Sequence, residues 1–307
     1  MLLEERVARP TTEAEAIELA RDLYGLPVTA KALPGEYDDN FHLTTPGDNP
    51  PHTKEEAAAA GFVLKVMHPA RERAFIDMQC CALQHLAKRA PQLTLPRVRL
   101  NRNGETFAAI TAADGSQRLV WLLSYVPGTM LAKARPHSPE LLHSLGLFLG
   151  EMDAALADFT HDAAGRELKW DLTRAGWIRA HLHLIHDASQ RALVEKFLSL
   201  YEVEVLPVLP HLRRSVVYGD ANDYNVLVGK ALPLPRKVVS VIDFGDMHET
   251  VTVSEVAIAA AYAILGKQDP LPAAAEVVRG YHRAFPLTEA ELKVLFALIG
   301  TRLGSAW

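Results

Sequence analysis

The sequence predicts an α+β fold with two lobes, a small antiparallel-sheet lobe followed by a mostly helical lobe. Up to Gly128, short extended segments follow one another through turns, which favours antiparallel pairing. After Gly128, long amphipathic segments dominate and only short extended runs interrupt them. These observations divide the chain into an N-terminal lobe, 1–128, with a hinge at 124–128, and a C-terminal lobe, 129–307.

The first lobe begins with a helix whose two ends are both marked in the sequence. Thr12 and Glu15 form a capping-box pattern at its start, and Gly25 ends it. The polar segment 46–61 is typical of a solvated loop. The remaining elements expected here are one helix and five extended segments: 70–88; 28–33, 40–45, 62–67, 105–111 and 118–126.

A long amphipathic helix at 138–159 opens the second lobe, with Ser138 as its N-cap and Pro139 in its first turn. Two apolar runs, 215–218 and 226–228, flank a polar loop, and we expect them to form a buried strand pair. The other elements expected are one strand and five helices: 238–244; 174–186, 189–206, 253–265, 272–284 and 288–302.

The composition limits the kinds of partner. Of 307 residues, 49% are hydrophobic and the net charge is −5, so we expect a large core and no global attraction to nucleic acid or to anionic membranes. A mildly acidic protein suits cationic or zwitterionic small substrates. Cys80 and Cys81 are adjacent in a predicted helix and point to different sides of it, which excludes a disulfide framework and fits a reducing compartment.

We also expect a cytoplasmic location. The N-terminal stretch lacks the cationic and long apolar regions of a signal peptide. No uncharged apolar run approaches the length that spans a bilayer.

Lys65 is the first residue that could carry chemistry. It lies in FVLKVM (62–67), where apolar residues occupy both faces of the predicted strand. A lysine in a strand buried on both sides needs a partner anion. The alternative is an edge strand from which Lys65 extends to water. The stretch itself leaves both readings open.

The polar loop in VVYGDANDYNVLV (216–228) is the second such feature. Asp220 and Asn225 lie five residues apart between apolar runs, and Asp243 ends the buried run VVSVIDF. An aspartate can accept the proton of an attacking hydroxyl, and asparagine and aspartate oxygens are suitable ligands for Mg²⁺. The order D-x-x-x-x-N, strand, strand, D-F-G, with a strand lysine upstream, matches the catalytic set of kinase-like phosphotransferases.

With these motifs, the chain resembles the aminoglycoside phosphotransferase and choline kinase superfamily, and within it the hydroxylysine kinase branch. The resemblance implies a protein-kinase-like, two-lobed fold with the nucleotide between the lobes. It also implies Mg²⁺-dependent transfer of a phosphoryl group from ATP or GTP to a hydroxyl of a small, amine-bearing molecule. The segments that carry the resemblance are YDDNFHL (37–43), VLKV (63–66), LLSYVPG (122–128), KWDL (169–172), GDANDYNVLV (219–228) and VIDFGDM (241–247).

The resemblance also implies a role for each matching residue. Asp220 would be the catalytic base, Asn225 and Asp243 would hold Mg²⁺, and Lys65 would contact the α- and β-phosphates. The tip between the first two strands would cover the phosphates, and the hinge would bind the base through its main chain. With the acid that pairs with the lysine, the implied nucleotide-binding residues are Lys65, Asp77, Tyr37, Asp38, Asp39, Asn40, Ser124, Tyr125 and Val126.

The chain departs from the family pattern at several places. Tyr218 replaces the usual histidine before Gly-Asp, and tyrosine can also donate a hydrogen bond while it packs. Asp77 is the best-aligned partner for Lys65, with Glu72 as the second choice, although Asp77 could instead form a surface pair with Arg73. There is no G-x-G-x-x-G motif. The chain ends at TRLGSAW, in what resembles a helix that relatives continue, and this leaves a truncated C-terminal lobe as an open alternative.

Three further acids could line the acceptor site: Asp223, Asp246 and Asp171. Asp171 could meet a substrate ammonium or cap the helix that begins at Leu172, and capping is slightly favoured. The histidines of HLHLIH (181–186) lack a carboxylate that would complete a zinc site, so we interpret them as structural or solvated.

The predicted function is therefore a small-molecule kinase that acts on 5-hydroxylysine or a related amino alcohol. An aminoglycoside kinase or a homoserine, choline or ethanolamine kinase is the alternative within the superfamily. A non-catalytic nucleotide-binding domain of a larger protein, fused or adjacent to an aminotransferase, is the alternative of another class. The intact set of Lys65, Asp220, Asn225 and Asp243 favours the enzyme.

Overall fold

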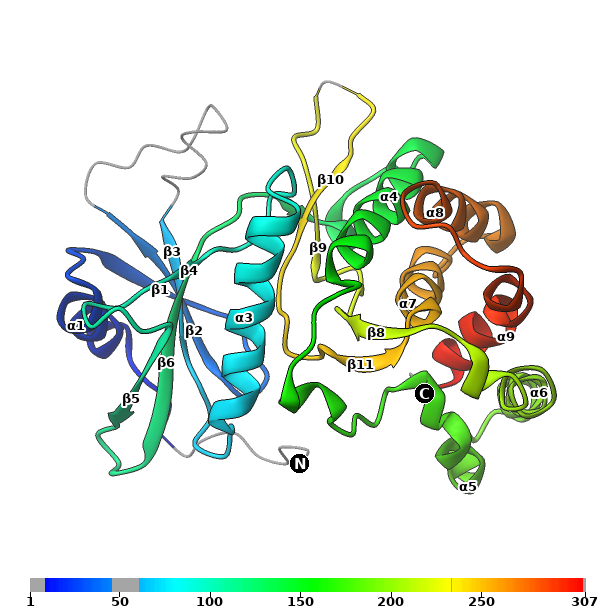
Figure 1. Cartoon of the computed structure of the whole chain (residues 1–307), viewed down its shortest axis with the longest axis horizontal. Coiled ribbons are helices and arrows are strands. Elements are labelled where there is room, and N and C mark those ends of the chain that lie inside the picture. The colour runs from blue at the N-terminus through cyan, green and yellow to red at the C-terminus, as the bar shows by residue number, and fades with distance from the viewer. Residues whose placement is uncertain (1–8, 46–60, 233, 306–307) are drawn as a thin grey trace. The chain divides into compact units, whose positions relative to one another are not determined.

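The structure is a computed structural model that describes residues 9–45, 61–232 and 234–305. The described chain forms two compact units, one from Met1–Lys88 and Thr94–Pro127 and the other from Arg89–Leu93 and Gly128–Trp307 (Figure 1). The solvated loop predicted at 46–61 falls, except for Gly61, outside the described residues.

An antiparallel sheet forms the centre of the first unit. Its strands run in the order β1-β2-β3-β6-β4, and β5 pairs with β6 as well. The predicted α+β architecture of this part is confirmed, and β4 is an additional short strand. The strands are β1 (Thr29–Leu33), β2 (Asp39–Thr44), β3 (Phe62–Val66), β4 (Val98–Arg99), β5 (Phe107–Thr111) and β6 (Gln117–Ser124).

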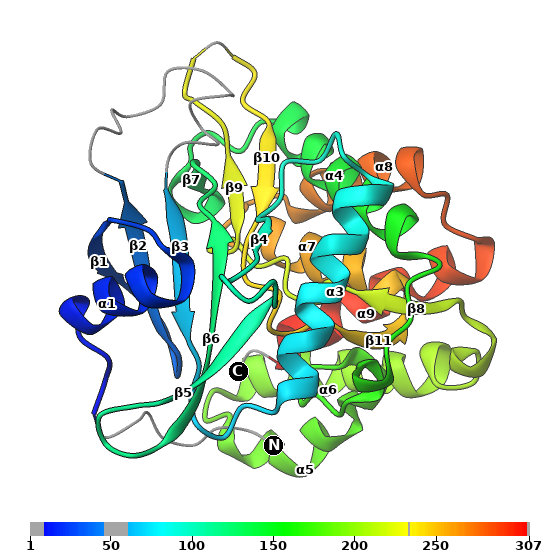
Figure 2. The ribbon, with the colours of Figure 1, turned by 60° about the vertical axis from the view of Figure 1, so that its left-hand side comes forward.

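Two helices, α1 (Glu13–Tyr24) and α3 (Arg73–Arg89), lie on opposite faces of this sheet (Figures 1 and 2). The capping box of Thr12 and Glu15 is present at the start of α1, and Gly25 ends the helix in the left-handed conformation, as predicted. Apolar side chains of α1 and of one sheet face form the core of the unit: Ala16, Ala20, Tyr24, Val28, Phe41, Leu43, Leu64, Val66, Val120 and Leu122.

Lys65 lies in an interior strand, because β3 pairs with β2 on one side and with β6 on the other. The edge-strand reading is therefore wrong. The expectation of burial on both faces is also wrong, since Val63 and Lys65 are half-buried whereas Leu64 and Val66 are buried. As Leu64 and Val66 face α1, the alternation of the strand directs Lys65 to the opposite face, where α3 lies.

A buried ion pair joins the segments around β3. Arg118 Nη1 lies 2.8 Å from Asp39 Oδ2, and the two side chains are only 1% and 7% exposed. Arg118 Nε and Nη2 donate to the carbonyl oxygens of Met67 and Val66 at 2.7 and 3.0 Å. Asp39 Oδ2 also accepts from the Thr11 N–H at 2.9 Å. One guanidinium therefore connects β2, β3 and β6 to the start of α1.

The second unit is mostly helical, as predicted. The two helices α4 (Pro139–Leu156) and α8 (Pro270–Ala284) approach so closely that a Cβ at Gly146 would lie 1.8 Å from Val277 O, and one at Gly280 would lie 2.0 Å from His143 O. Only glycine allows this contact. The other α-helices are α5 (Ile178–His181), α6 (Ala188–Leu200), α7 (Val253–Ala263) and α9 (Glu289–Ser305).

One predicted helix is broken into short pieces. The segment predicted as helical over 174–186 forms a 3₁₀ helix, Leu172–Trp177, then α5, then a second 3₁₀ turn, Leu182–Leu184. The predicted helix 189–206 is α6 followed by a π-helical turn, Tyr201–Val205. Tyr201 donates through its hydroxyl to Thr173 O at 2.8 Å, which ties the two segments together.

The strands of the second unit pair differently from the prediction. The strand β8 (Arg214–Val217) pairs with β11 (His248–Val251), whereas β9 (Val226–Val228) pairs with β10 (Val238–Val241) and with β7 (Thr129–Met130). The expected pairing of 215–218 with 226–228 is therefore wrong. The loop between β8 and β9 connects two sheets, so it must be held in place by contacts of its own.

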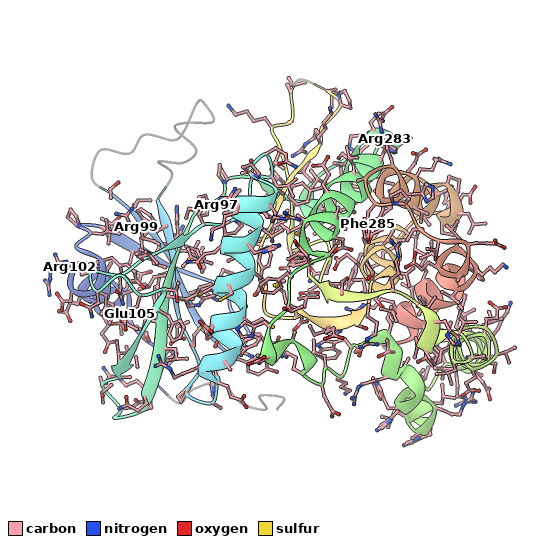
Figure 3. The ribbon with its side chains drawn as sticks, viewed as in Figure 1. Arg97, Arg99, Arg102, Glu105, Arg283 and Phe285 are labelled. Carbon is pink, nitrogen blue, oxygen red and sulfur yellow. The ribbon has the colours of Figure 1, made fainter. Side chains whose placement is uncertain are left out.

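A second buried acid anchors the C-terminal helices. Arg213 Nε and Nη2 donate to the two carboxylate oxygens of Glu291 at 2.8 and 2.6 Å, and Glu291 is fully buried. The Arg213 guanidinium also lies 4.7 Å from the ring centroid of Phe285, the residue that follows α8 and that Figure 3 labels. This contact fixes α9 against the start of β8.

None of the described helices is long and apolar enough to cross a membrane. Cys80 is buried and Cys81 is half-buried, and both are free thiols, as the sequence predicts.

We predict that Asp39→Ala lowers the free energy of unfolding by about 3–5 kcal/mol, because it leaves the buried Arg118 charge without its partner. Urea denaturation would measure the loss. Asp22→Ala is the matched control, since the Arg21–Asp22 pair is more than half exposed on both sides and should contribute at most about 1 kcal/mol. Equal losses in the two variants would contradict a structural role for the Asp39 pair.

Candidate active site

The loop between β8 and β9 holds the carboxylate of Asp220 with two carboxamides. Asn225 Nδ2 donates to Asp220 Oδ2 at 2.6 Å, and Asn222 Nδ2 donates to Asp220 Oδ1 at 2.8 Å. The other end of the Asn222 side chain, Oδ1, accepts from the N–H groups of Tyr224 and Asn225. The structure thus brings the predicted pair Asp220 and Asn225 into direct contact, and Asn222 fixes the shape of the loop that carries them.

The loop is also bonded to its surroundings at both ends. At its start, the Tyr218 hydroxyl donates to Ile242 O at 2.5 Å, and the ring packs edge-on against Phe244 with centroids 5.1 Å apart. At its end, Asn225 O accepts from Ile242 N at 2.9 Å. Tyr218 therefore combines a hydrogen bond with packing, and both ends of the loop meet the residue that precedes Asp243.

Gly219 makes a further connection, to helix α7. Its N–H donates to Glu255 Oε2 at 2.7 Å, and Glu255 is fully buried. Gly219 has φ +77°, and a Cβ at this position would lie 2.9 Å from Asp246 O. The residue before Asp220 must therefore be glycine, and its backbone is held by a buried carboxylate.

Asp243 has a strained backbone. Its φ is +62°, and it is the one non-glycine residue with positive φ among those that the structure describes. Its Oδ1 accepts from Gly245 N at 3.3 Å, and the residue is exposed. Left-handed backbone outside glycine is concentrated at functional sites, where the surrounding contacts maintain it. The strain at Asp243 singles out this carboxylate on a structural criterion that is independent of the D-F-G pattern.

The charges of the loop and of the D-F-G segment act on one another. Burial is the main cause that raises the pKa of Asp220 to about 7, and the charges of Asp246 and Asp243 add to it. Burial also raises the pKa of Asp246, and there Arg166 acts in the opposite direction. Arg166 Nη1 donates to Gly245 O at 2.8 Å. Three carboxylates in one region repel one another, and a bound cation would reduce this repulsion.

Two residues of this region were not predicted from the sequence. Glu255 lies in VSEVAIAAAYA, as a single carboxylate in an otherwise apolar helix, and Arg302 follows the apolar run VLFALIG. A lone charge in a buried helix was the available signal, because such a charge needs a partner. The sequence could not say that both charges would lie near Asp220.

In the first unit, the turn between β1 and β2 and the strand β3 hold the predicted nucleotide-binding residues. Asn40 is the cross-strand partner of Lys65, and Trp121 is the partner of Lys65 on the other side. Lys65 Nζ lies 5.8 Å from the Trp121 ring centroid. Tyr37 is half-buried in the turn that precedes β2.

The acids of this turn have structural partners. Asp38 Oδ1 accepts from His68 N at 2.7 Å, and Asp38 Oδ2 pairs with Arg71 at 3.1 Å. Asp39 pairs with the buried Arg118. Both carboxylates therefore stabilise the turn, and a nucleotide contact from this segment would come most readily from its backbone.

The predicted hinge follows β6. Ser124 N donates to Arg97 O, and Ser124 Oγ accepts from Arg97 N, both at 2.9 Å; Figure 3 labels Arg97. Tyr125 N donates to Gly61 O at 3.0 Å. Among the N–H groups of residues 124–126, that of Val126 donates to no other described residue. Asp77, the predicted partner of Lys65, is half-buried on α3.

Asp171 caps the 3₁₀ helix Leu172–Trp177, which agrees with the capping interpretation. Its carboxylate accepts from Thr173 N, Thr173 Oγ1 and Thr250 Oγ1 at 3.0, 2.6 and 2.7 Å, and His248 Nε2 lies 3.7 Å from Oδ1. An acceptor contact by Asp171 stays an untested prediction. Asp223 is half-buried, and its carbonyl oxygen accepts from Ala132 N.

The helical histidines have local partners. His181 Nδ1 lies 3.0 Å from Trp177 O, and His183 Nδ1 lies 3.1 Å from Ala180 O. These contacts are consistent with a structural role.

The fold is protein-kinase-like, as in solved structures of small-molecule kinases. The chain belongs to the phosphotransferase enzyme family, whose family model matches residues 29–293. It is a small-molecule kinase.

Two relatives and two solved structures support this assignment. The chain is 30% identical to a hydroxylysine kinase of Danio rerio over 95% of this chain and 81% of the relative, and 28% identical to one of Xenopus laevis over 96% and 81%. Among solved structures, an amicoumacin kinase in complex with AMP-PNP and Ca²⁺ matches with a TM-score of 0.68 at 15% identity, over 96% of this chain and 85% of that one. A microcompartment-associated aminopropanol kinase matches with a TM-score of 0.67 at 18% identity, over 96% and 90%. These two structures share the fold.

We predict that Asp171→Asn lowers the free energy of unfolding at pH 7 by about 1–3 kcal/mol, because a buried acceptor of several hydrogen bonds loses its charge. Burial alone would raise the pKa of Asp171, but His248, Thr173 and Thr250 hold it well below its usual value. A carboxyl with a lowered pKa stabilises the fold above its unfolded pKa, near 4, and loses this effect as the pH falls further.

The difference between wild type and Asp171→Asn should therefore shrink as the pH is lowered from 5 to 3. Urea denaturation across this range measures it. Asp158→Asn is the control, since Asp158 is more than half exposed in its pair with Arg89 and should show a small difference throughout. A difference that stays constant between pH 5 and 3 would show that the ionised form of Asp171 has no special stabilising role.

Proposed function

We propose that this kinase transfers the γ-phosphoryl group of ATP or GTP to the hydroxyl of a small amine-bearing acceptor, with 5-hydroxylysine as the leading candidate and Asp220 as the base. The observation that carries the proposal is the hydrogen-bonded pair of Asp220 and Asn225, held next to the strained Asp243. The names of the sequence relatives support the choice of acceptor.

Asp220 would orient the acceptor hydroxyl and accept its proton as the oxygen attacks the γ-phosphorus. Both carboxylate oxygens are held by carboxamide N–H groups, so their direction is fixed before the acceptor arrives. Such preorganisation contributes more to phosphoryl transfer than covalent chemistry does. The bonds of Tyr218 and Gly219 position the backbone on which Asp220 stands.

Asn225 and Asp243 would hold Mg²⁺. Their side chains offer the carboxamide and carboxylate oxygens that this ion prefers. The two residues also lie close together, because Ile242, which precedes Asp243, donates its N–H to Asn225 O. Burial is the main cause that raises the pKa of Asp220 and Asp246, and the charges of neighbouring aspartates, which add to it, also favour a cation here. When bound, Mg²⁺ neutralises negative charge on the transferred phosphoryl group.

The nucleotide-binding residues would come from the first unit. Lys65 would contact the α- and β-phosphates, with Asp77 as its partner. The turn Tyr37–Asn40 would cover the phosphates through its backbone, since the Asp38 and Asp39 carboxylates are already engaged. At the hinge Ser124–Val126, the N–H of Val126 would bind the base. A backbone contact of this kind is compatible with both ATP and GTP.

The acceptor amine would meet acidic side chains of the second unit. Asp246 is the leading candidate, because it is only partly exposed and its charge acts directly on that of Asp220. Asp223 lies on the same loop as Asp220 and is the second candidate. Ammonium groups are bound by such carboxylates through charge-assisted hydrogen bonds.

We predict that Asp220→Asn lowers kcat with 5-hydroxylysine by about 10²- to 10⁴-fold, because the variant keeps the shape but cannot accept a proton. Release of ADP or GDP measures it, with each nucleotide tested separately. Removal of Mg²⁺ by EDTA should abolish turnover, and Asp243→Asn should raise the Mg²⁺ concentration needed for half-maximal rate.

The control is Asp269→Asn, an exposed aspartate at the start of α8. Aminoglycosides, homoserine, choline and ethanolamine are tested beside 5-hydroxylysine. A better turnover of one of these acceptors would replace the proposed substrate and leave the chemistry intact. Nucleotide binding without turnover of any acceptor would instead identify a non-catalytic nucleotide-binding domain.

A further inference from the structure

Arg302 on α9 is a buried cation whose donors are poorly satisfied. The residue is 8% exposed, and its guanidinium carries five N–H donors. Nη2 donates to the Tyr262 hydroxyl at 3.1 Å, and the guanidinium lies 5.5 Å from the Tyr262 ring centroid. Nε is buried and meets no acceptor among the described residues. Across that part of the chain, no aspartate or glutamate forms an ion pair with Arg302 either.

This arrangement is unusual for arginine. A buried guanidinium is normally paired with a carboxylate, because loss of its hydration is otherwise uncompensated. Arg213 in the same unit has such a partner, because it donates two hydrogen bonds to the carboxylate of the fully buried Glu291. Arg302 differs in that tyrosine, a neutral group, is its one hydrogen-bonded side chain among the described residues. Among the described residues, Arg302 therefore lacks the anionic partner that a buried guanidinium normally has.

The place of Arg302 indicates what the missing partner is. Arg302 donates to Tyr262 on α7, the helix whose Glu255 accepts from the Gly219 N–H next to Asp220. In agreement with this position, its charge opposes the effect of burial on the pKa of both Asp220 and Asp246. It forms no direct ion pair with either. A ligand bound here would therefore meet a cation as well as carboxylates. That pattern matches a zwitterion, whose ammonium and carboxylate groups are a few bonds apart.

We propose that Arg302 binds the carboxylate of the acceptor, so that the enzyme selects a hydroxy amino acid over the amino alcohol that lacks the carboxylate. The inference rests on the proposed function and narrows its substrate class. The planar guanidinium offers two parallel N–H groups to the two oxygens of a carboxylate, which gives both charge pairing and direction. Asp246 would then hold an ammonium group of the same molecule, while its hydroxyl meets Asp220.

The test compares two acceptors that differ only in the carboxylate, 5-hydroxylysine and 1,5-diaminopentan-2-ol. For the wild type, we expect kcat/KM to be about 10- to 100-fold higher with 5-hydroxylysine, the range of a hydrogen-bonded charge pair. Arg302→Met should reduce this preference, because it raises KM for 5-hydroxylysine by a larger factor than KM for the diamine. Arg302→Lys should keep part of the preference. Arg279→Met, at an exposed arginine of α8, is the matched control.

Each other outcome overturns the inference in a recognisable way. If the wild type turns over both acceptors equally, no carboxylate site exists, and this result does not depend on the folding of any variant. If Arg302→Met lowers both activities equally, Arg302 acts on Asp220 or on the fold. If it changes only KM for the nucleotide, Arg302 binds a phosphate.

Failure of the proposed function gives a different result. If the wild type phosphorylates neither acceptor, the proposed kinase reaction with these acceptors is wrong, and calorimetric binding of the same two molecules then tests the site. Tighter binding of 5-hydroxylysine that Arg302→Met abolishes would support the carboxylate site without that reaction. Equal binding of the two molecules would overturn it.

Discussion

The position of the loop between β8 and β9 is the constraint on which the rest of the site depends. The strands before and after it belong to different sheets, so strand pairing cannot hold the loop. Buried polar contacts do so instead: the Tyr218 hydroxyl on Ile242 O, Asn225 O on Ile242 N, and Glu255 on the Gly219 N–H. Each is worth more in a buried region than at the surface, because an unpaired group there would lose its hydration. The direction of the Asp220 carboxylate follows from them.

The concentration of negative charge in this region has a second consequence. Burial and the charges of neighbouring aspartates raise the pKa of Asp220 and Asp246, so the ionised form of each carboxyl is disfavoured. Arg166 and Arg302 supply positive charge close by, and neither forms an ion pair with Asp220. A metal ion and a cationic acceptor would neutralise the remaining negative charge. The same repulsion would thus favour the binding of cations, and the strained backbone of Asp243 fits a compromise between stability and activity.

Prediction from the sequence succeeded where the signal was local. The capping box at Thr12, the left-handed Gly25 and the Ser138 cap each depend on residues within one turn of the helix they mark. Strand pairing was harder: β8 and β9 are close in the chain and apolar, yet each pairs with a distant strand. The interior position of β3 in its sheet was equally difficult to predict, because a five-residue segment with apolar residues on both faces can lie inside a sheet or at its edge. Long-range pairing is decided by the whole sheet.

The candidate chemistry follows from local sequence alone, because Asp220, Asn225 and Asp243 stand in an order and spacing that few other functions require. The two-lobed α+β class follows in the same way from the change from short extended to long amphipathic segments. The packing of distant segments shows instead that Asp38 and Asp39 are held by Arg71 and Arg118, that Glu255 accepts from the Gly219 N–H, and that Arg302 is buried beside Tyr262. The reason is physical. A motif fixes which groups are available, whereas burial, the partner of each charge and the backbone strain arise only when distant segments pack together.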